Sequence, residues 1–428
     1  MEAREYLENL LHTRKEIDDW IAGKASPWKK GYIRYDGELG WLFRSGRFQD
    51  GVDGSTSTYN FDDLGPRRLI SYRDKSCRIN TYGDSFTECH QVSDGETWQE
   101  VLSAHLCEPI RNYGVGGYSV YQAYLRMMRE EIKTPAEYII FNIYDDDHYR
   151  NLNGLGKPSR PYVKVNPAKG EFVEFKNPYP TPESLYNQCD VDHVYETFRN
   201  DFVLKIRLIL DCPHQDGENL QKILEDGIIS ENLKDSYDDI GDLASLDRPH
   251  RDGETLQKIL ENGNILENIK GCYDDIGDLA SKHGIEASIT SGEGLVKTAS
   301  LLYDRAAIFA SMRIVEKVED FAAENGKKVL YVLSFRSGSL AKKVNEGCRF
   351  DQDFVDFLKS RQLPFIDLME AHMAEFAKFN TSIEDYLQPY YIGHYTPLGN
   401  FFQAFAVKDR LVDMLEPKPI SYRDDEEN

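Results

Sequence analysis

Short apolar runs alternate along the chain with amphipathic segments of helical spacing. The runs are typical of strands in a parallel sheet that is buried on both faces, and they occupy residues 77–82, 109–112, 138–143, 328–333 and 363–367. Apolar residues three or four positions apart predict helices at 1–24, 97–106, 119–132, 297–324 and 351–360. Strands that alternate with helices indicate an α/β protein with a doubly wound parallel sheet.

An internal repeat lies between the third and fourth of these strands. Residues 216–245 and 252–281 match at an offset of 36, with 23 of 30 positions identical. Each copy has the pattern of two short helices joined at a glycine, Gly227 or Gly263. Two copies are fewer than a free-standing solenoid needs, so we expect a helical repeat insertion that packs against the main domain. It could serve as a lid or as an interaction surface.

These patterns predict an α/β domain in two parts with additions. Residues 1–75 are expected to form an N-terminal helix and an extension that packs on the core. The α/β domain is predicted at 76–211 and 283–417, separated by the insertion at 212–282. The last segment, 418–428, is an acidic tail.

The net charge of -22 is concentrated in the insertion. Residues 212–281 contain 17 acids and 6 bases, a net charge of -11, which is half of the surplus. An acidic balance argues against nucleic acid or an anionic membrane surface as the main partner, because both require a basic footprint. The insertion is the better candidate for binding a protein partner or a second copy of the chain.

Further sequence features suggest the cellular compartment. The N-terminal residues lack a basic region followed by an apolar run, and no stretch approaches the roughly 18 to 20 apolar residues of a transmembrane helix. The 7 cysteines are odd in number, widely spaced and without a C-x-x-C pair, so a disulfide framework and a zinc site are both disfavoured. We therefore expect a cytoplasmic protein with free thiols.

Two motifs at opposite ends of the chain could carry chemistry. Gly83-Asp84-Ser85 follows the first predicted strand, which places the Ser85 hydroxyl at the carboxyl edge of the sheet, where doubly wound folds have their sites. His394 lies in the segment Gly-His-Tyr-Thr-Pro-Leu-Gly-Asn, just before an apolar C-terminal helix. A neutral imidazole within reach of a serine hydroxyl can act as its general base.

Two more motifs complete an ordered set. A glycine-rich turn, which begins at Asn112 and ends at Gly117, follows the second strand, and Asp145-Asp146 follows the third. With Ser85 and His394, this order resembles the SGNH (GDSL) hydrolase family. The segments 40–44 and 65–68 resemble the lead-in of many bacterial members, so the resemblance covers about 37–151 and 297–415.

The resemblance implies a flavodoxin-like sheet and a serine esterase mechanism without a metal or an organic cofactor. Ser85 would be the nucleophile, His394 the base, and Gly117 with the Ser85 backbone N–H would stabilise the oxyanion. The substrate would be a small or carbohydrate-linked ester.

The chain departs from the family pattern at two positions. The family's oxyanion asparagine corresponds to Asp145, or to Asp146 if the alignment shifts by one residue; an ionised aspartate cannot donate a hydrogen bond, so Asn142 is an alternative donor. The family's catalytic acid, three residues before the histidine, corresponds to Tyr391, which could orient the imidazole but carries no charge at neutral pH. A Ser–His dyad, or an acid from Asp385 or the 145–147 cluster, are the alternatives.

Three other functions remain to be compared with the hydrolase. One is an inactive scaffold whose acidic repeats are the working surface, and another is an acyltransferase that uses the same serine. A third interpretation is a divalent cation site at residues 145–148, although adjacent side chains rarely converge on one ion. A nicotinamide site is disfavoured because the glycine-rich turn does not have the G-x-G-x-x-G spacing.

Overall fold

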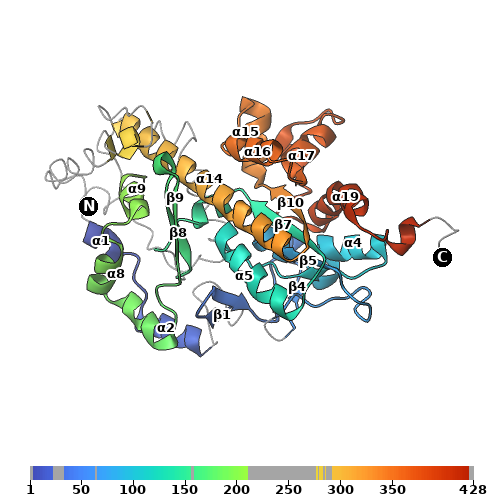
Figure 1. Cartoon of the computed structure of the whole chain (residues 1–428), viewed down its shortest axis with the longest axis horizontal. Coiled ribbons are helices and arrows are strands. Elements are labelled where there is room, and N and C mark those ends of the chain that lie inside the picture. Colours follow the sequence, from blue (N-terminus) through green and yellow to red (C-terminus); the bar gives the residue numbers. More distant parts are fainter. Residues whose placement is uncertain are drawn as a thin grey trace. The chain divides into compact units, whose positions relative to one another are not determined.

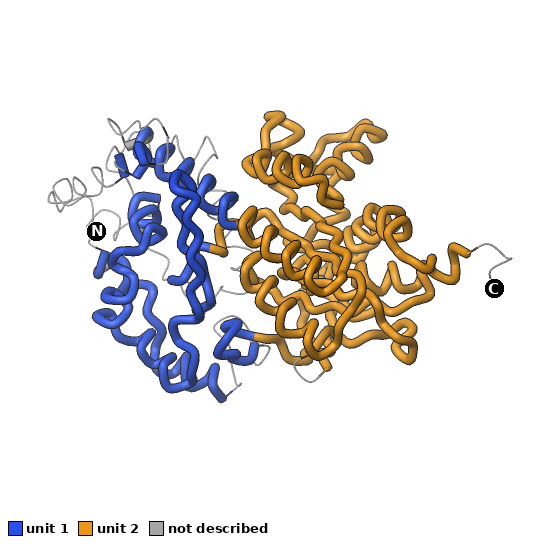
Figure 2. Tube along the Cα trace, viewed as in Figure 1, with its two compact units in different colours: residues 1–41, 152–310 blue, residues 42–151, 311–428 orange. Residues whose placement is uncertain are grey.

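The computed structural model describes residues 3–22, 33–62, 65–155, 159–210, 276–277, 279–282, 285 and 292–423. The chain divides into two compact units (Figure 2), and each is made of two separate segments. The sheet unit comprises residues 42–151 and 311–428, and the N-terminal unit comprises residues 1–41 and 152–310. Among the helices that are described, none has the length and apolar character needed to span a membrane.

A five-stranded parallel sheet forms the centre of the sheet unit. Its strands in chain order are β5 (Ile79–Tyr82), β6 (Arg111–Asn112), β7 (Tyr138–Tyr144), β10 (Lys328–Ser334) and β11 (Phe365–Asp367). They confirm the five predicted strands to within two residues at each end. The spatial order is β6-β5-β7-β10-β11, so the direction of progression reverses at β5. The carboxyl ends of β5 and β7 therefore flank the switch point at which such sheets bind ligands.

Helices cover both faces of the sheet (Figure 1), because successive side chains of a strand point to opposite faces. On one face lie α5 (Val120–Lys133) and α14 (Gly292–Glu324). The Tyr82 hydroxyl donates to Glu131 of α5 at 2.8 Å, and the Tyr331 hydroxyl donates to Glu319 of α14 at 2.7 Å. On the other face, α4 (Trp98–Leu106) packs against α19 (Pro397–Met414). This arrangement confirms the predicted doubly wound α/β architecture.

Shorter elements surround the sheet. Those that follow its strands are α3 (Ser85–Glu88), α6 (Asp147–Arg150), α15 (Ser337–Glu346), α16 (Gln352–Ser360), α17 (Leu368–Phe376) and α18 (Ile383–Leu387). A two-stranded antiparallel sheet, β3 (Gly46–Phe48) with β4 (Ser57–Tyr59), precedes them. The segment that follows β4 joins the main sheet, because Arg67 forms a bridge with Asn112 of β6. Residues 42–75 are thus part of the sheet unit.

The N-terminal unit has its own core. It contains α1 (Ala3–Glu8), α2 (Arg14–Ile21), β1 (Ile33–Asp36), the first half of β2 (Gly40–Phe43), the hairpin β8 (Tyr162–Asn166) and β9 (Glu171–Phe175), α7 (Pro182–Leu185), α8 (Val191–Phe198), α9 (Phe202–Leu210) and the first part of α14. Leu7 of α1 packs with Tyr162 of β8 and Phe198 of α8. Because residues 152–210 build this separate core, the unit boundary falls inside the segment predicted as 76–211.

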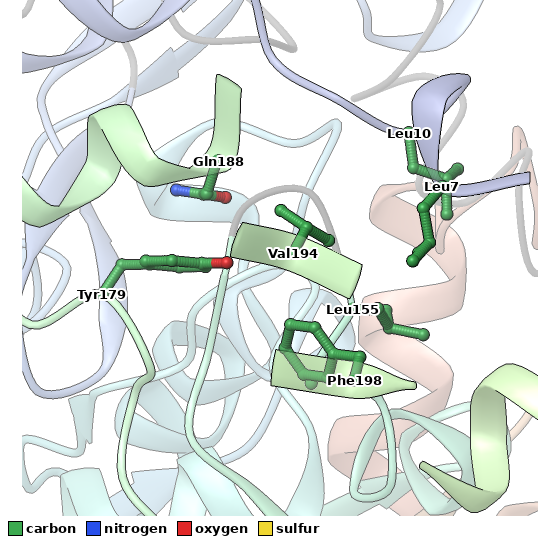
Figure 3. A pocket seen from close by; sticks show the side chains of 8 residues that line it. Leu7, Leu10, Leu155, Tyr179, Gln188, Val194 and Phe198 are labelled. Carbon is green, nitrogen blue, oxygen red and sulfur yellow. The ribbon is translucent and has the colours of Figure 1, made fainter. Parts of the chain in front are cut away.

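A small cavity of about 20 Å³ lies in this core, where α1 meets α8. Leu7 of α1 and Leu10 just after it line the cavity on one side, and Val194 and Phe198 line it from α8 (Figure 3). Its size suits a single water molecule rather than an organic ligand.

The prediction of one continuous helix over residues 1–24 was wrong. The helix is interrupted between α1 and α2, because Thr13 begins α2 with a capping box: its hydroxyl accepts from the Glu16 backbone at 3.2 Å, and the Glu16 carboxylate accepts from the Thr13 backbone at 2.6 Å. The pattern Thr-x-x-Glu is the sequence signal for this break.

Most of the repeat lies outside the described residues, and the expectation of a helical insertion is therefore untested there. Only residues 276–277 and 279–282 of the insertion are described. Ile276 and Ala280 are buried against Ile206 of α9 and Leu295 of α14. The end of the second copy thus belongs to the core of the N-terminal unit.

The turn after β6 passes directly over α3 and requires glycine. A Cβ atom on Gly114 would collide with the backbone of Thr87 and Glu88. Gly114→Ala is therefore expected to lower the free energy of unfolding by about 1–3 kcal/mol, a range typical of overpacking, as measured by the urea midpoint. Gly95→Ala is the matched control, because a Cβ there meets no atom within 4 Å, and an equal loss in both variants would contradict the prediction.

Candidate active site

The turn that carries Ser85 is shaped by the residues on either side of it. Gly83 has φ +154°, and a Cβ there would lie 2.8 Å from the carbonyl oxygen of Asn142. Asp84 caps α3, and its carboxylate accepts from the Phe86 backbone at 3.0 Å. Ser85 is therefore the first residue of a helix that starts at the carboxyl end of β5, with its N–H groups at the edge of the sheet.

The turn that carries His394 is built from residues of its own motif. Gly393 has φ +103°, and the Ile392 N–H donates to the His394 carbonyl at 2.9 Å. Thr396 caps α19, with Pro397 in the first turn. A Cβ on Gly399 would lie 2.5 Å from the carbonyl oxygen of Tyr390, so this glycine lets the helix start against the turn.

These two turns bring Ser85 and His394 together across 309 positions of the sequence. Nε2 of His394 lies 2.8 Å from Oγ of Ser85. Both residues are buried, with 3% and 2% of their surface exposed. Phe86 packs against the imidazole at a centroid distance of 5.2 Å and stacks on Tyr144 at 4.4 Å. The predicted pair is thus in hydrogen-bonding geometry inside an aromatic environment.

The other imidazole nitrogen contacts a residue that sequence reasoning missed. Oε1 of Gln91 lies 3.2 Å from Nδ1 of His394 and 2.8 Å from its backbone nitrogen. A backbone N–H can only donate, so the amide atom that faces it must be the oxygen. Nδ1 then carries the proton that points to Gln91, and Nε2 presents its lone pair to the Ser85 hydroxyl.

Tyr391 was predicted to orient the imidazole, but the hydrogen bonds of its hydroxyl are to other groups. The Tyr391 hydroxyl donates to the carbonyl of Phe335 at 3.1 Å and contacts the Tyr395 hydroxyl at 3.2 Å. Burial raises the pKa of Tyr391, so it stays neutral. The alternative acid Asp385 is exposed, and its carboxylate accepts from Thr381 at 3.4 Å. None of these three hydrogen bonds involves the imidazole of His394.

A buried arginine supports the loop that carries Gln91. The Arg67 guanidinium donates to the carbonyls of Glu88, Cys89 and Val92 at 2.6, 2.9 and 2.6 Å, and it forms an ion pair with Asp94 at 2.8 Å. Cys89 and Gln91 have positive φ, 64° and 69°. The cation therefore satisfies the carbonyls of a loop whose backbone is strained.

A second buried arginine binds the acids around the nucleophile. Arg150 forms ion pairs with Asp146 and Asp147 at 2.8 Å, and its guanidinium lies 3.6 Å from Asp84. The Asp84 carboxylate is also 3.2 Å from Oγ of Ser85. Burial and the neighbouring Asp84 raise the pKa of Asp147. Asp146 and Asp147 are thus tied to the serine turn through Arg150.

Asp145 and Asn142, the two predicted oxyanion residues, make side-chain hydrogen bonds to residues that follow β10 or end it. The Asp145 carboxylate accepts from Ser339 at 2.6 Å and from Arg336 at 3.4 Å. The Asn142 amide donates to Ser334 at 3.1 Å. In both contacts the Asp145 carboxylate is the acceptor, so neither supplies the donor that an asparagine would supply.

The glycine-rich turn packs against α3, beside the serine turn. The Val115 N–H donates to the Gly83 carbonyl at 3.1 Å, and the Gly116 N–H lies 3.2 Å from the Glu88 carboxylate. Gly117 has φ +75°, so it is a glycine that the turn requires. Gly117 belongs to the same turn as Val115 and Gly116, which contact the segment around Ser85.

The interpretation of residues 145–148 as a divalent cation site is wrong, because their side chains face other protein groups. Asp145 faces Arg336, Asp146 and Asp147 face Arg150, and Nδ1 of His148 lies 2.7 Å from the Ser311 hydroxyl. In the part of the chain that the structure describes, no group of three or more His, Cys, Asp and Glu residues is placed to hold a metal ion.

A pocket of about 290 Å³ lies near the sheet edge, between α15 and α18. Ser337, Gly338 and Ala341 line it from one side, and Leu387 and Tyr391 line it from the other. The Tyr391 and Tyr395 rings are 4.7 Å apart, and Tyr395 packs on Phe86 at 5.2 Å. Aromatic side chains therefore connect this pocket to the serine turn.

No family model matches the chain, and a search of curated proteins found no match.

The buried His148 is expected to make stability pH-dependent. Burial lowers the pKa of His148 to about 4, so the folded state holds it neutral. Below the ordinary value of 6.5 the unfolded chain binds a proton that the folded chain does not, and stability is lost as the pH falls from 6.5 toward 4, by on the order of 3 kcal/mol at most. The melting temperature measured between pH 7 and pH 4.5 should follow this slope.

His148→Gln should reduce that slope, and the exposed His193 offers a matched control in His193→Gln. Buried His372, whose pKa is lowered to about 3 by burial, contributes in the same direction and remains in both variants. Identical slopes in the wild type and in His148→Gln would show that His148 does not hold this linkage.

Proposed function

We propose that the chain is a serine hydrolase of the SGNH type that cleaves a carboxylic ester. The observation that carries the proposal is the 2.8 Å contact between Oγ of Ser85 and Nε2 of His394, at the switch point of a doubly wound sheet. The order of the four motifs along the chain supports the same family. By that resemblance, the substrate is a small or carbohydrate-linked ester.

The proposed reaction proceeds through an acyl-enzyme. His394 takes the Ser85 hydroxyl proton while Oγ attacks the ester carbonyl, and the proton then passes to the alcohol oxygen as its bond to the carbonyl carbon breaks. Water repeats the sequence in the second half: His394 takes its proton, the acid is released, and the proton returns to Oγ of Ser85. The net reaction converts the ester and one water molecule into a carboxylic acid and an alcohol.

Oxyanion stabilisation is assigned to backbone donors. In the proposal, the N–H groups of Ser85 and Gly117 face the developing negative charge, and one such donor is commonly worth about 2.7–4 kcal/mol. Asp145 takes no part as a donor because its carboxylate binds Ser339 and Arg336. The site would therefore operate with fewer side-chain donors than the family pattern includes.

A fluorophosphonate probe tests the proposal directly. The wild-type chain should be labelled on Ser85, Ser85→Ala should not be labelled, and His394→Gln should be labelled about 10² to 10⁴ times more slowly, the range expected for loss of a general base. Labelling is quantified by intact mass, and turnover is measured on a panel of short acyl esters.

Ser360→Ala is the matched control, because Ser360 is exposed on α16 and donates to its own helix. It should be labelled as fast as the wild type. No labelling and no ester turnover in the folded wild-type chain would refute the hydrolase, and a rate that requires an added alcohol acceptor would identify a transferase instead.

A further inference from the structure

We propose that Gln91 is the positioning residue of the site, so that Ser85, His394 and Gln91 form a triad in which an amide replaces the usual carboxylate. This inference rests on the proposed function. It assigns a role to a residue that belongs to none of the four motifs.

The contact is specific because one amide oxygen faces two N–H groups of the same histidine. Oε1 of Gln91 lies 2.8 Å from the backbone nitrogen of His394 and 3.2 Å from Nδ1. The backbone bond fixes the position of the turn, and the Nδ1 contact fixes the tautomer and the ring orientation. A single side chain therefore sets both where the imidazole lies and which nitrogen faces Ser85.

The surrounding backbone is shaped to allow this contact. Gln91 has φ +69°, a strained conformation for a residue with a long side chain, and its N–H donates to the Tyr59 hydroxyl at 2.6 Å. A Cβ on Gly393 would lie 3.2 Å from Oε1 of Gln91, so the glycine leaves room for the amide. Strain of this kind persists only where neighbouring structure enforces it, and Arg67 supplies that support.

The charged and titratable groups that face His394 and Gln91 come from several elements. The His90 ring lies 4.9 Å from the His394 ring, and the Asp50 carboxylate is 3.7 Å from Nε2 of His90. Asp84 contacts Oγ of Ser85 at 3.2 Å, and Arg150 lies 3.6 Å from Asp84. Tyr59 accepts from the Gln91 backbone, and Arg67 donates to the Glu88 carbonyl of the same loop.

A neutral amide and a carboxylate have different effects on the imidazole. Both accept from Nδ1, but only the carboxylate stabilises the imidazolium with a full negative charge. Gln91→Glu keeps the shape of the side chain and adds that charge. It should raise the pKa of His394 by about 1 to 3, the effect of an opposite charge within about 4–6 Å, and move the acidic limb of the pH profile of kcat/KM to higher pH by the same amount.

Gln91→Ala removes the contact without replacing it. A displaced or misoriented base should lower kcat by about 10²-fold, and Gln91→Glu should recover most of that loss at a pH above its new limb. Gln352→Glu is the matched control, because Gln352 is exposed on α16. It should leave the pKa of His394 and the pH profile unchanged.

The pKa of His394 is read by NMR titration of its ring resonances, assigned with His394→Gln. The titration is carried out in the Ser85→Ala background and compared with and without Gln91→Glu, so this readout does not require activity. An unchanged titration in a folded Gln91→Glu protein would overturn the contact, and full kcat in a folded Gln91→Ala protein would overturn the positioning role. Absence of fluorophosphonate labelling in the wild type would refute the proposed hydrolase while the titration still reports the contact.

Discussion

The geometry of the site depends on the buried Arg67 guanidinium and the loop that it holds. The chain must turn sharply after the short helix α3, and Arg67 donates to the buried carbonyls of Glu88, Cys89 and Val92. The Glu88 carbonyl also accepts from the Asn112 amide at 3.4 Å. An unsatisfied buried carbonyl costs about 1–3 kcal/mol. One planar cation, itself neutralised by Asp94, satisfies all three carbonyls and keeps the strained loop in a single conformation.

This loop connects local strain to the arrangement of the distant motif. Gln91 leaves the loop toward His394, whose own turn is held by Gly393 and by the cap of α19. Neither turn can set the Ser85–His394 distance alone, because the two motifs belong to strands and helices at opposite ends of the sequence. The sheet brings the chain segments to one edge, and the Gln91 amide sets the remaining orientation.

The sequence predicted those parts whose signals are local. The five strands are short apolar runs, and Ser85 and His394 lie beside glycines and helix caps that the backbone requires. Both residues could therefore be named as candidates, and the fold brings them within hydrogen-bonding distance. Gln91 has no such signal: a glutamine after a short helix is ordinary surface composition, and its role depends on a left-handed backbone fixed by Arg67, 24 positions earlier. The partners of Asp145, Arg336 and Ser339, follow a strand about 190 positions later and could not be read from its neighbours.

The acids at the sheet edge further constrain the proposed chemistry. Asp84, Asp146 and Asp147 share Arg150, and Asp145 has Arg336, so two guanidinium groups partly offset four carboxyl groups at this edge. Asp84 nonetheless lies 3.2 Å from Oγ of Ser85, and a carboxylate at that distance opposes a free alkoxide. Under the proposed mechanism the serine proton must therefore move to His394 as the new bond forms. The 2.8 Å contact and the tautomer set by Gln91 are what that concerted step requires.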